Sequence, residues 1–354
     1  MTRLAVSVDQ LYRPQPGGIA SYVRGLAGAL ASLDADWDVR AVAPRGELAE
    51  SLALARTRVP LDVATLTRLW RFVPVGVPSN SDVVHATSLA GPFGGGRPGA
   101  VHSVALHDVL WRDHPGATTR RGAAFHESRL HLLRRRESVR IFTTSPGLAD
   151  RLAAEGFAPS RVHYVRLGVD DDVVPVDVAQ VAASLAREGV VGPYTLYVGT
   201  REPRKNLTRL IGAHALARRS EPGLGPLVLV GPAGWGAVDT ADAVVLGARE
   251  RSLVKGLIRD ATVVAYVALA EGWGLPPVEA LFAGSRVVAG RDVPSVGAND
   301  EVIAVDPLDE SSIAEGLVRA CALADDEQAR ERRHASVSDQ TWDRSLADHL
   351  EGWR

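Results

Sequence analysis

The chain has 354 residues, which is too long for one ordinary core and, at about 150 residues per domain, suggests two domains. Hydrophobic residues make up 46% of it and charged residues 23%, which excludes a disordered chain, a collagen and a coiled coil. Lys and Arg number 40 against 42 Asp and Glu, so the net charge of -2 argues against a nucleic-acid partner.

Cysteine usage and apolar runs indicate the compartment. The single cysteine, Cys321, cannot form an intramolecular disulfide, which is typical of a reducing compartment. The first apolar run lacks the features of a signal peptide, and no run is long and unbroken enough to span a membrane. The sequence therefore predicts a cytoplasmic protein.

Short apolar runs alternate with helical patterns through the first half of the chain. Strands are predicted at residues 4–9, 39–43, 83–86, 101–106, 141–144 and 162–167. Helices are predicted at residues 18–33 and at about 117–138. Because the strands are almost continuously apolar, both of their faces should be buried, as in a parallel sheet covered by helices.

The alternation is interrupted near Asp170 by three consecutive aspartates and by Pro175, and it then resumes. Strands are predicted at residues 195–198, 227–230, 243–246, 263–267, 286–289 and 302–305. Helices are predicted at residues 178–188, 206–219, 251–260, 277–283 and 311–324. Each half of the chain is typical of a doubly wound α/β domain.

We therefore expect an α/β protein with two doubly wound, Rossmann-like domains that face a cleft, in residues 1–170 and 171–338. A terminal helix is expected in residues 339–354, and its apolar stripe consists of Trp342, Leu346, Leu350 and Trp353. That stripe should dock either on the second domain or, by crossing back, on the first. Ligands of open α/β sheets bind beyond the carboxyl ends of strands, so the loops that follow strands are where chemistry is expected.

The most informative loop is Glu271-Gly272-Trp273-Gly274-Leu275-Pro276-Pro277-Val278-Glu279-Ala280, which follows a strand and opens a helix. Its prolines suit a first helical turn, and its glycines let backbone amides approach a phosphate at the helix N-terminus. Glu271 and Glu279 can accept hydrogen bonds from sugar hydroxyls. Glu279 alone would be interpreted as a first-turn acid that complements the helix dipole, but the whole string favours a ligand site.

A second loop, Gly199-Thr200-Arg201-Glu202-Pro203-Arg204-Lys205-Asn206, places three cations between a strand and a helix. Arg grips phosphate through two N–H groups and Lys adds a point charge, so the loop predicts a diphosphate site. The alternative is a solvated basic turn. Two weaker candidates are Gly17-Gly18 at a helix start and His107-Asp108 at a strand end.

Several motifs of other chemistries are missing. The sequence has no Cys/His metal spacing, no Walker loop, no strand-turn-helix G-x-G-x-x-G and no G-x-S-x-G elbow. Its acidic runs, such as Asp34-Ala35-Asp36, are better interpreted as solvated loops. We therefore expect neither a metal nor a bound cofactor.

Together these strings resemble the family 4 (group 1) retaining glycosyltransferases, which have the GT-B fold, over almost the whole chain. The strings that carry the resemblance are Pro16-Gly17-Gly18-Ile19, His107-Asp108, Thr144-Ser145, Leu167-Gly168-Val169-Asp170, Val198-Gly199-Thr200, Glu202-Pro203-Arg204-Lys205-Asn206-Leu207 and the ten residues from Glu271 to Ala280. The last string has seven residues between its two glutamates, as in the two-glutamate motif of that family.

The resemblance implies roles for these residues. Arg204 and Lys205 would hold the donor diphosphate, and Glu279 would bind the ribose hydroxyls. Glu271 and the amides that follow it would hold the donor sugar and the adjoining phosphate, and His107 would contact the transferred sugar. The implied catalytic residues are His107, Arg204, Lys205 and Glu271. The implied donor-binding residues are Gly17, Gly18, Gly199, Thr200, Trp273, Gly274, Leu275 and Glu279.

Three positions depart from the family pattern. Pro294-Ser295 stands where Pro-Glu is frequent, and Arg166 stands where Pro usually precedes the hinge. Thr200 stands where some members have Arg, which leaves Arg204 or Arg201 to supply the guanidinium. Trp342 resembles the aromatic residue at the start of the terminal helix of the family, which crosses back to the first domain.

The expected reaction is transfer of a hexose, with mannose favoured, from a nucleotide-diphosphate sugar to a hydroxyl of a saccharide or lipid-linked saccharide. The resemblance implies retention at the anomeric carbon and a role in envelope or exported polysaccharide synthesis. Fixed cations and helix amides could stabilise the leaving diphosphate without a metal. The alternatives are a nucleotide-sugar epimerase or phosphorylase on the same scaffold, and a non-catalytic sugar-nucleotide-binding subunit.

The acceptor side is marked only by the Arg-rich helix near residues 117–138. Its arginines, with one at its exit, are Arg120, Arg121, Arg129, Arg134, Arg135, Arg136 and Arg140. A basic amphipathic surface can touch anionic lipid at the inner face of the plasma membrane, and the alternative is a solvated basic face.

Overall fold

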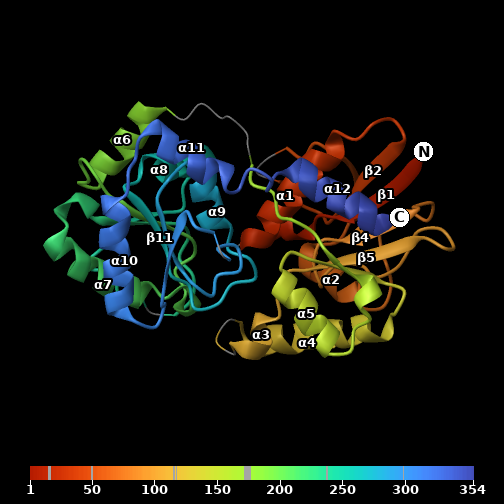
Figure 1. Ribbon diagram of the computed structural model, residues 1–354. Coiled ribbons are helices and arrows are strands. Elements are labelled where there is room, and N and C mark those ends of the chain that lie inside the picture. Colours follow the sequence, from red (N-terminus) through yellow and green to blue (C-terminus); the bar gives the residue numbers. More distant parts are fainter. Residues whose placement is uncertain are drawn as a thin grey trace. The chain divides into compact units, whose positions relative to one another are not determined.

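The computed structural model of the chain describes residues 1–14, 17–48, 51–114, 116, 118–170, 177–236, 238–297 and 299–354. Five residues on which the sequence analysis drew lie outside this part of the chain: Pro16, Ala117 at the expected start of the Arg-rich helix, Asp171, Asp172 and Pro175. The chain divides into two compact units, residues 1–170 with 340–354 and residues 171–339 (Figure 1).

The first unit is built on a parallel sheet of seven strands in the described residues. They are β1 (Thr2–Ser7), β2 (Trp37–Ala43), β3 (Ala55–Arg58), β4 (Val83–Ala86), β5 (Val101–Leu106), β6 (Arg140–Thr143) and β7 (Val162–Tyr164). Their spatial order is β3-β2-β1-β4-β5-β6-β7. The chain therefore builds outward from β1 in both directions, and the order reverses between the paired strands β1 and β4.

Helices cover both faces of this sheet. They are α1 (Gly17–Ala31), α2 (Val63–Leu69), α3 (Leu110–Asp113), α4 (Arg120–Arg135), α5 (Pro146–Ala154) and α12 (Trp342–Trp353), with the short 3-10 turns η1 (Asp9–Tyr12) and η3 (Pro159–Arg161). In Figure 1, α1 and α12 lie side by side, and α4 and α5 lie on the opposite side of the strands. The sequence analysis missed β3, α2 and α5, which are short; β3 is moreover a polar strand at the sheet edge.

Helix α12 packs within the first unit, and its first residue, Trp342, makes a large part of this contact. The indole Nε1 of Trp342 donates to Asp170 Oδ1 at 2.7 Å. A Cβ atom on Gly25 would lie 1.8 Å from the Trp342 ring, and one on Gly168 would lie 2.5 Å from its backbone nitrogen. These two glycines therefore make the room that the indole fills. Nearby, Arg166 forms a bidentate ion pair with Asp348 on α12. Arg166, which stands where the family pattern usually has Pro, therefore has a partner on the terminal helix.

The second unit repeats the plan with six parallel strands in its described part. They are β8 (Thr195–Val198), β9 (Leu227–Val230), β10 (Val244–Gly247), β11 (Val263–Tyr266), β12 (Val287–Gly290) and β13 (Val302–Val305), in the order β10-β9-β8-β11-β12-β13. Its helices are α6 (Val178–Arg187), α7 (Leu207–Ser220), α8 (Arg251–Asp260), α9 (Leu275–Phe282), α10 (Glu310–Ala322) and α11 (Glu327–Ala335), with η4 (Pro203–Lys205) and η5 (Pro222–Leu224). The order reverses between β8 and β11, which pair.

The prediction of two doubly wound α/β domains is confirmed. Helix α11 was missed because it is polar almost throughout and buries only Ala329 and Arg333. Among the described helices, none has the length and apolar character needed to cross a membrane. Open α/β sheets bind their ligands beyond the carboxyl ends of the strands, at the point where the strand order reverses. Each sheet therefore has one such point.

Candidate functional site

In the second unit, the loops after β8 and β11 meet at the point where the strand order reverses. Arg204 Nη1, Lys205 Nζ and the Tyr266 hydroxyl lie 2.8, 2.5 and 2.9 Å from one oxygen, Glu271 Oε1. Lys205 Nζ also donates to the Tyr266 hydroxyl at 2.6 Å. We call these four residues the Glu271 clamp. It brings together three of the four expected catalytic residues.

The backbone around the clamp is fixed by Asn206. This residue adopts a left-handed conformation (φ 62°) between η4 and α7. Its side-chain amide donates to the carbonyls of Val267 and Pro307 at 3.0 and 2.6 Å. The Leu269 amide also donates to the Arg204 carbonyl at 2.8 Å. The loops that follow β8 and β11 are therefore tied to each other, which holds Arg204 and Lys205 against Glu271.

Charge balance sets the protonation of the clamp. Burial raises the pKa of Glu271, but Lys205 and Arg204 outweigh it and hold that pKa below its usual value. Burial lowers the pKa of Lys205 in spite of the Glu271 carboxylate. Burial also raises the pKa of Tyr266 well above its usual value, so the phenol keeps its proton and serves as a donor. Glu271 is thus an ionised, buried carboxylate surrounded by donors.

Glu202 is a member of this site that the sequence analysis did not single out. Its side chain is 2% exposed, and its Oε1 lies 2.6 Å from Arg204 Nη2. Arg204 therefore lies between two carboxylates. Arg201, the alternative source of a guanidinium, donates instead to the Gly231 carbonyl at 3.2 Å. Tyr266 was missed as well, because the end of an apolar strand gives no signal for a polar role.

The loop that opens α9 depends on one glycine and one serine. Gly274 has φ 95°, and a Cβ atom there would lie 2.5 Å from Val293 Cγ1. The Ser295 hydroxyl donates to the Gly274 carbonyl at 2.5 Å, and the Ser295 amide donates to the Trp273 carbonyl at 2.9 Å. Ser295, one of the departures from the family pattern, thus fixes the backbone of this loop. Leu275 is the first residue of α9.

The prediction that Glu279 lies in the first turn of its helix is wrong. Helix α9 begins at Leu275, two residues earlier than expected, so Glu279 is in the second turn, where the helix dipole acts weakly. Burial raises its pKa, while Arg251 and Lys255 of α8 act in the opposite direction. Glu279 makes no contact with Arg204 or Lys205; it is a separate, half-buried carboxylate.

Gly199 and Thr200 follow β8 in a tightly packed turn. Gly199 has φ 151° and donates to the Val230 carbonyl at 2.8 Å, and the Tyr197 hydroxyl donates to the Thr200 carbonyl at 2.9 Å. In the first unit, Gly17 and Gly18 are exposed at the start of α1, and a Cβ atom on either would meet nothing within 4 Å. The space in front of the latter pair is open.

His107 lies at the end of β5 as a neutral imidazole. Its Nε2 is 2.9 Å from the Thr87 carbonyl, which can only accept, so Nε2 carries the proton and Nδ1 is left as an acceptor. Burial lowers the pKa of His107. The Tyr22 ring packs edge-on against it at 4.8 Å between centroids. Asp108, by contrast, accepts from the Leu110 amide at the first residue of α3.

Behind His107, α1, β4 and α12 share a buried hydrogen-bond chain. The Tyr22 hydroxyl lies 2.9 Å from His85 Nε2 and 2.8 Å from His349 Nε2. His349 Nδ1 lies 2.6 Å from the Ser345 carbonyl, so it must donate there and accept from Tyr22 through Nε2. Tyr22 has one proton, and His85 must therefore donate to it. We call Tyr22, His85 and His349 the neutral chain.

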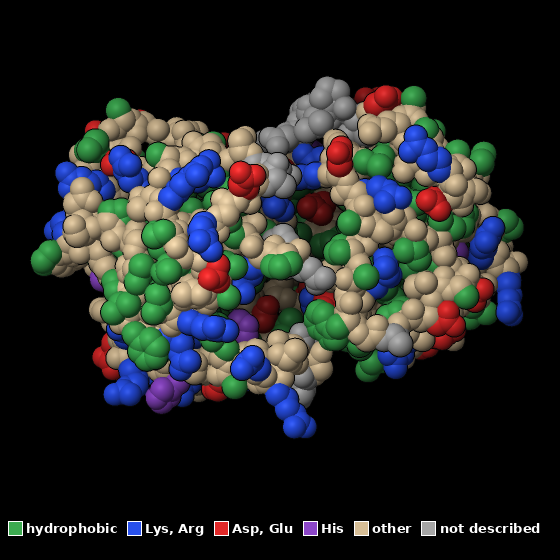
Figure 2. Space-filling model, turned by 180° about the vertical axis from the view of Figure 1, so that it is seen from behind, with side chains coloured by type: hydrophobic (Ala, Val, Ile, Leu, Met, Phe, Trp, Pro, Cys, Tyr) green, Lys and Arg blue, Asp and Glu red, His purple; other side chains and the backbone are tan. Residues whose placement is uncertain are grey.

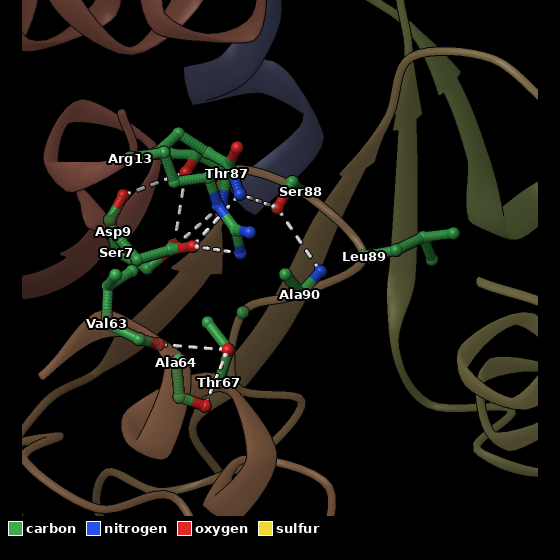
Figure 3. A network of polar contacts seen from close by, with 12 residues as sticks. Ser7, Asp9, Arg13, Val63, Ala64, Thr67, Thr87, Ser88, Leu89 and Ala90 are labelled. Carbon is green, nitrogen blue, oxygen red and sulfur yellow. Dashed lines mark hydrogen bonds and ion pairs between the residues drawn. The ribbon is translucent and has the colours of Figure 1, made fainter. Parts of the chain in front are cut away.

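A second polar group lies at the strand reversal of the first unit, beside β1 and β4 (Figure 3). Ser7 and Thr87 pair through their hydroxyls at 3.2 Å. The Gln10 amide donates to Asp9 Oδ2 and to the Ser88 hydroxyl at 2.9 and 3.1 Å. Asp9 is 0% exposed, and burial raises its pKa. The sequence analysis placed Asp9 only as a strand end, although that position is the signal that could have identified it.

Counting Arg129 among the surface arginines of α4 is wrong. Arg129 is 0% exposed and donates to the carbonyls of Leu89, Trp70 and Gly91. Arg136 and Arg140 also donate to backbone carbonyls, and Arg134 pairs with Glu155. Arg120, Arg121, Arg134, Arg135 and Arg136 are exposed, and no hydrogen bond or ion pair was found for Arg120, Arg121 and Arg135 among the described residues. On the face seen in Figure 2, Lys and Arg side chains are scattered among uncharged ones.

Within the described part of the chain, no group of three or more His, Cys, Asp or Glu side chains is arranged so that it could hold a metal ion. Neither unit therefore offers an evident cage of such ligands there. Independence from metals stays a prediction.

The comparison with protein families gives this geometry a context. Residues 16–173 match the family model described as Glycosyltransferase Family 4. O-antigen chain mannosyltransferase B of Escherichia coli is 27% identical over 219 residues, which are 56% of this chain and 55% of that protein. The chain thus spans only slightly more than half the length of this curated relative.

Solved structures resemble the whole chain. A sucrose-phosphate synthase from Thermosynechococcus elongatus has a TM-score of 0.71 at 18% identity, covering 99% of this chain and 98% of that one. Anabaena HepE in complex with UDP and glucose has a TM-score of 0.72 at 16% identity, covering 99% and 100%. WaaG, a glycosyltransferase involved in lipopolysaccharide biosynthesis, has a TM-score of 0.66 at 16% identity, covering 99% and 98%.

The two doubly wound units therefore have the GT-B fold of glycosyltransferases. Within that class, residues 16–173 are similar to glycosyltransferase family 4.

Proposed function

We propose that this glycosyltransferase moves a hexose, mannose favoured, from a nucleotide-diphosphate sugar to a hydroxyl of a saccharide or lipid-linked saccharide. The observation that carries the proposal is the Glu271 clamp, which gathers Arg204 and Lys205 where the strand order of the second sheet reverses. A mannosyltransferase name on the Escherichia coli relative and UDP with glucose in the HepE title support the donor class.

The chemistry needed is departure of a nucleoside diphosphate from the anomeric carbon. Negative charge grows on the leaving phosphate, and Arg204, Lys205 and the amides at the start of α9 would stabilise it without a metal. Glu279 on α9 would take the ribose hydroxyls. His107 would accept a hydrogen bond from the transferred sugar through Nδ1. Retention at the anomeric carbon is part of this proposal and rests on the family resemblance.

A thermal-shift panel of UDP, GDP, ADP and TDP sugars tests the donor, because a ligand that binds the folded state raises its stability with affinity. We expect one GDP-linked or UDP-linked hexose to give the largest shift. Product analysis then separates the alternatives: an epimerase or a phosphorylase changes the donor without an acceptor alcohol, and a binding subunit leaves it intact. Absence of a shift with every nucleotide would remove the proposal.

The cellular setting is part of the same proposal. We place the reaction in the cytoplasm, in envelope or exported polysaccharide synthesis, because the chain has a single cysteine and its relatives include O-antigen and lipopolysaccharide enzymes. A lipid-linked acceptor would bring the exposed Arg120, Arg121 and Arg135 near anionic lipid. Co-sedimentation with liposomes, with and without anionic lipid, tests this contact.

A further inference from the structure

The two cations proposed to hold the donor diphosphate are already engaged by carboxylates. Arg204 lies between Glu202 and Glu271, and Lys205 donates to the same oxygen of Glu271. Two acidic side chains thus face two basic ones. A diphosphate that approaches this site meets cations whose charge is largely compensated.

The compensation is concentrated in one carboxylate oxygen. Glu271 Oε1 takes all three hydrogen bonds from Arg204, Lys205 and Tyr266, and Glu271 Oε2 has no hydrogen-bond partner among the described residues. The side chain of Glu271 is only 8% exposed. Glu202 and Glu271 already balance the charges of Arg204 and Lys205. At such burial, a diphosphate oxygen added to the same donors would bring further, uncompensated negative charge and a large repulsion. A diphosphate oxygen and Glu271 therefore compete for Arg204 and Lys205.

We propose that the donor diphosphate displaces the Glu271 carboxylate from Arg204 and Lys205, while Glu202 keeps Arg204 in place. This inference rests on the proposed function. The displaced carboxylate is then available to the hydroxyls of the donor sugar, which offset the cost of breaking its ion pairs. A nucleoside diphosphate without a sugar offers no such replacement. After transfer, Glu271 returns to the two cations and drives the product diphosphate out.

The experiment measures the affinity of inorganic pyrophosphate, GDP and UDP by titration calorimetry. In Glu271→Gln the competing charge is gone but the size of the side chain is kept. We expect this variant to bind pyrophosphate about tenfold more tightly than the wild type, which corresponds to one competing charge at moderate screening. Turnover of the donor sugar should fall in the same variant, because the sugar loses its carboxylate.

Two matched variants separate charge from structure. Glu315→Gln makes the same change in net charge at an exposed position on α10, and should bind pyrophosphate like the wild type. Tyr266→Phe removes a neutral donor to Glu271 and should change pyrophosphate affinity less than Glu271→Gln does. If Glu271→Gln is unstable, Glu271→Ala is used, and pyrophosphate should raise its unfolding temperature more than that of the wild type.

The outcomes distinguish the two claims. The first outcome is that the wild type binds a nucleoside diphosphate but both Glu271 variants bind pyrophosphate no more tightly than the wild type does. This result would overturn the displacement and leave the proposed function intact. No nucleotide or pyrophosphate binding by any variant, with folding verified by circular dichroism, would defeat the proposed function itself.

Discussion

The two units solve the problem of buried polar groups in opposite ways. The Glu271 clamp buries full charges that compensate one another, and three donors crowd one oxygen. The neutral chain of the first unit buries no charge: each nitrogen and hydroxyl has one assigned direction, from His85 through Tyr22 to His349. The two arrangements differ in what can replace their parts. A negatively charged ligand can take the place of one carboxylate of the clamp. In the neutral chain, by contrast, adding or removing a proton on any member leaves a hydrogen bond unmade.

That difference separates a binding site from a scaffold. Ion pairs in a buried site are costly to desolvate and are easily exchanged for another ion of the same sign. A chain of neutral hydrogen bonds is fully satisfied only in one arrangement, and so it fixes geometry. The neutral chain joins α12 to α1 and β4 directly behind His107. We therefore interpret α12 as part of the wall that supports His107.

The largest expected effect comes from removing a cation of the clamp. Arg204→Ala and Lys205→Ala should each lower kcat/KM for the donor about 10²–10³-fold, because a fixed donor to the leaving phosphate is lost. Steady-state kinetics with the donor found in the thermal-shift panel measures this. Arg219→Ala, a change of an exposed arginine on α7, is the control. Unchanged kcat/KM in both clamp variants would exclude them from catalysis.

The second effect is a difference in acid sensitivity. Burial lowers the pKa of His349 to about 4 from 6.5, and that of His85 well below 6.5. As the pH falls, His349 and His85 are therefore protonated in the unfolded chain at a higher pH than in the folded one. The free energy of unfolding is thus unaffected above pH 6.5 and declines as the pH falls toward 4. For His349 alone the decline amounts to roughly 3 kcal/mol. Glu271, with its pKa below 4.5, loses its contribution only at lower pH.

The measurement for this comparison is urea unfolding at several pH values, followed by tryptophan fluorescence. His349→Gln can still accept from Tyr22 but does not titrate, so its stability should depend less steeply on pH between 6.5 and 4. His131→Gln, a change of an exposed histidine on α4, should leave the slope unchanged. Equal slopes in His349→Gln and the wild type would mean that the neutral chain does not titrate as the geometry requires.

A smaller effect is expected when the middle of the neutral chain is removed. Tyr22→Phe keeps the ring that packs against His107 but leaves nitrogens of His85 and His349 unpaired, at a cost of about 2 kcal/mol. Urea unfolding measures the loss. Tyr12→Phe, at a partly exposed tyrosine in η1, should cost much less. If His107 depends on this support, kcat should fall in Tyr22→Phe while the KM of the donor changes little.

The sequence predicted the repeated α/β plan and most of the strands because unbroken apolar runs have few other structures available to them. It also indicated the loops at Glu271 and Arg204, because glycine, proline and charge at a strand end leave a local pattern. It could not indicate Tyr266, Glu202 or Tyr22. Their roles come from partners that are distant in the chain, as between Tyr22 and His349, and burial is what makes those partners necessary.

The same limit explains the two wrong expectations about charge. Arg129 was counted as surface because arginine is rarely buried, yet backbone carbonyls can accept the hydrogen bonds of a buried guanidinium. Glu279 was assigned to a first turn because two prolines usually mark a helix start, but α9 begins before both of them. In the first case the deciding feature was a set of contacts with residues distant in the sequence, and in the second it was the residue at which the helix begins.

The smallest expected effect tests whether a neutral bond beside the clamp behaves like those of the first unit. Ser295→Ala removes the hydroxyl that donates to the Gly274 carbonyl, at a cost of about 1 kcal/mol, and keeps the amide bond to Trp273. The loop at the start of α9 should become less ordered, so donor KM should rise several-fold with kcat nearly unchanged. Ser311→Ala on α10 is the matched control, since that side chain is exposed. A fall in kcat with constant KM would show instead that this loop acts on the leaving phosphate during transfer.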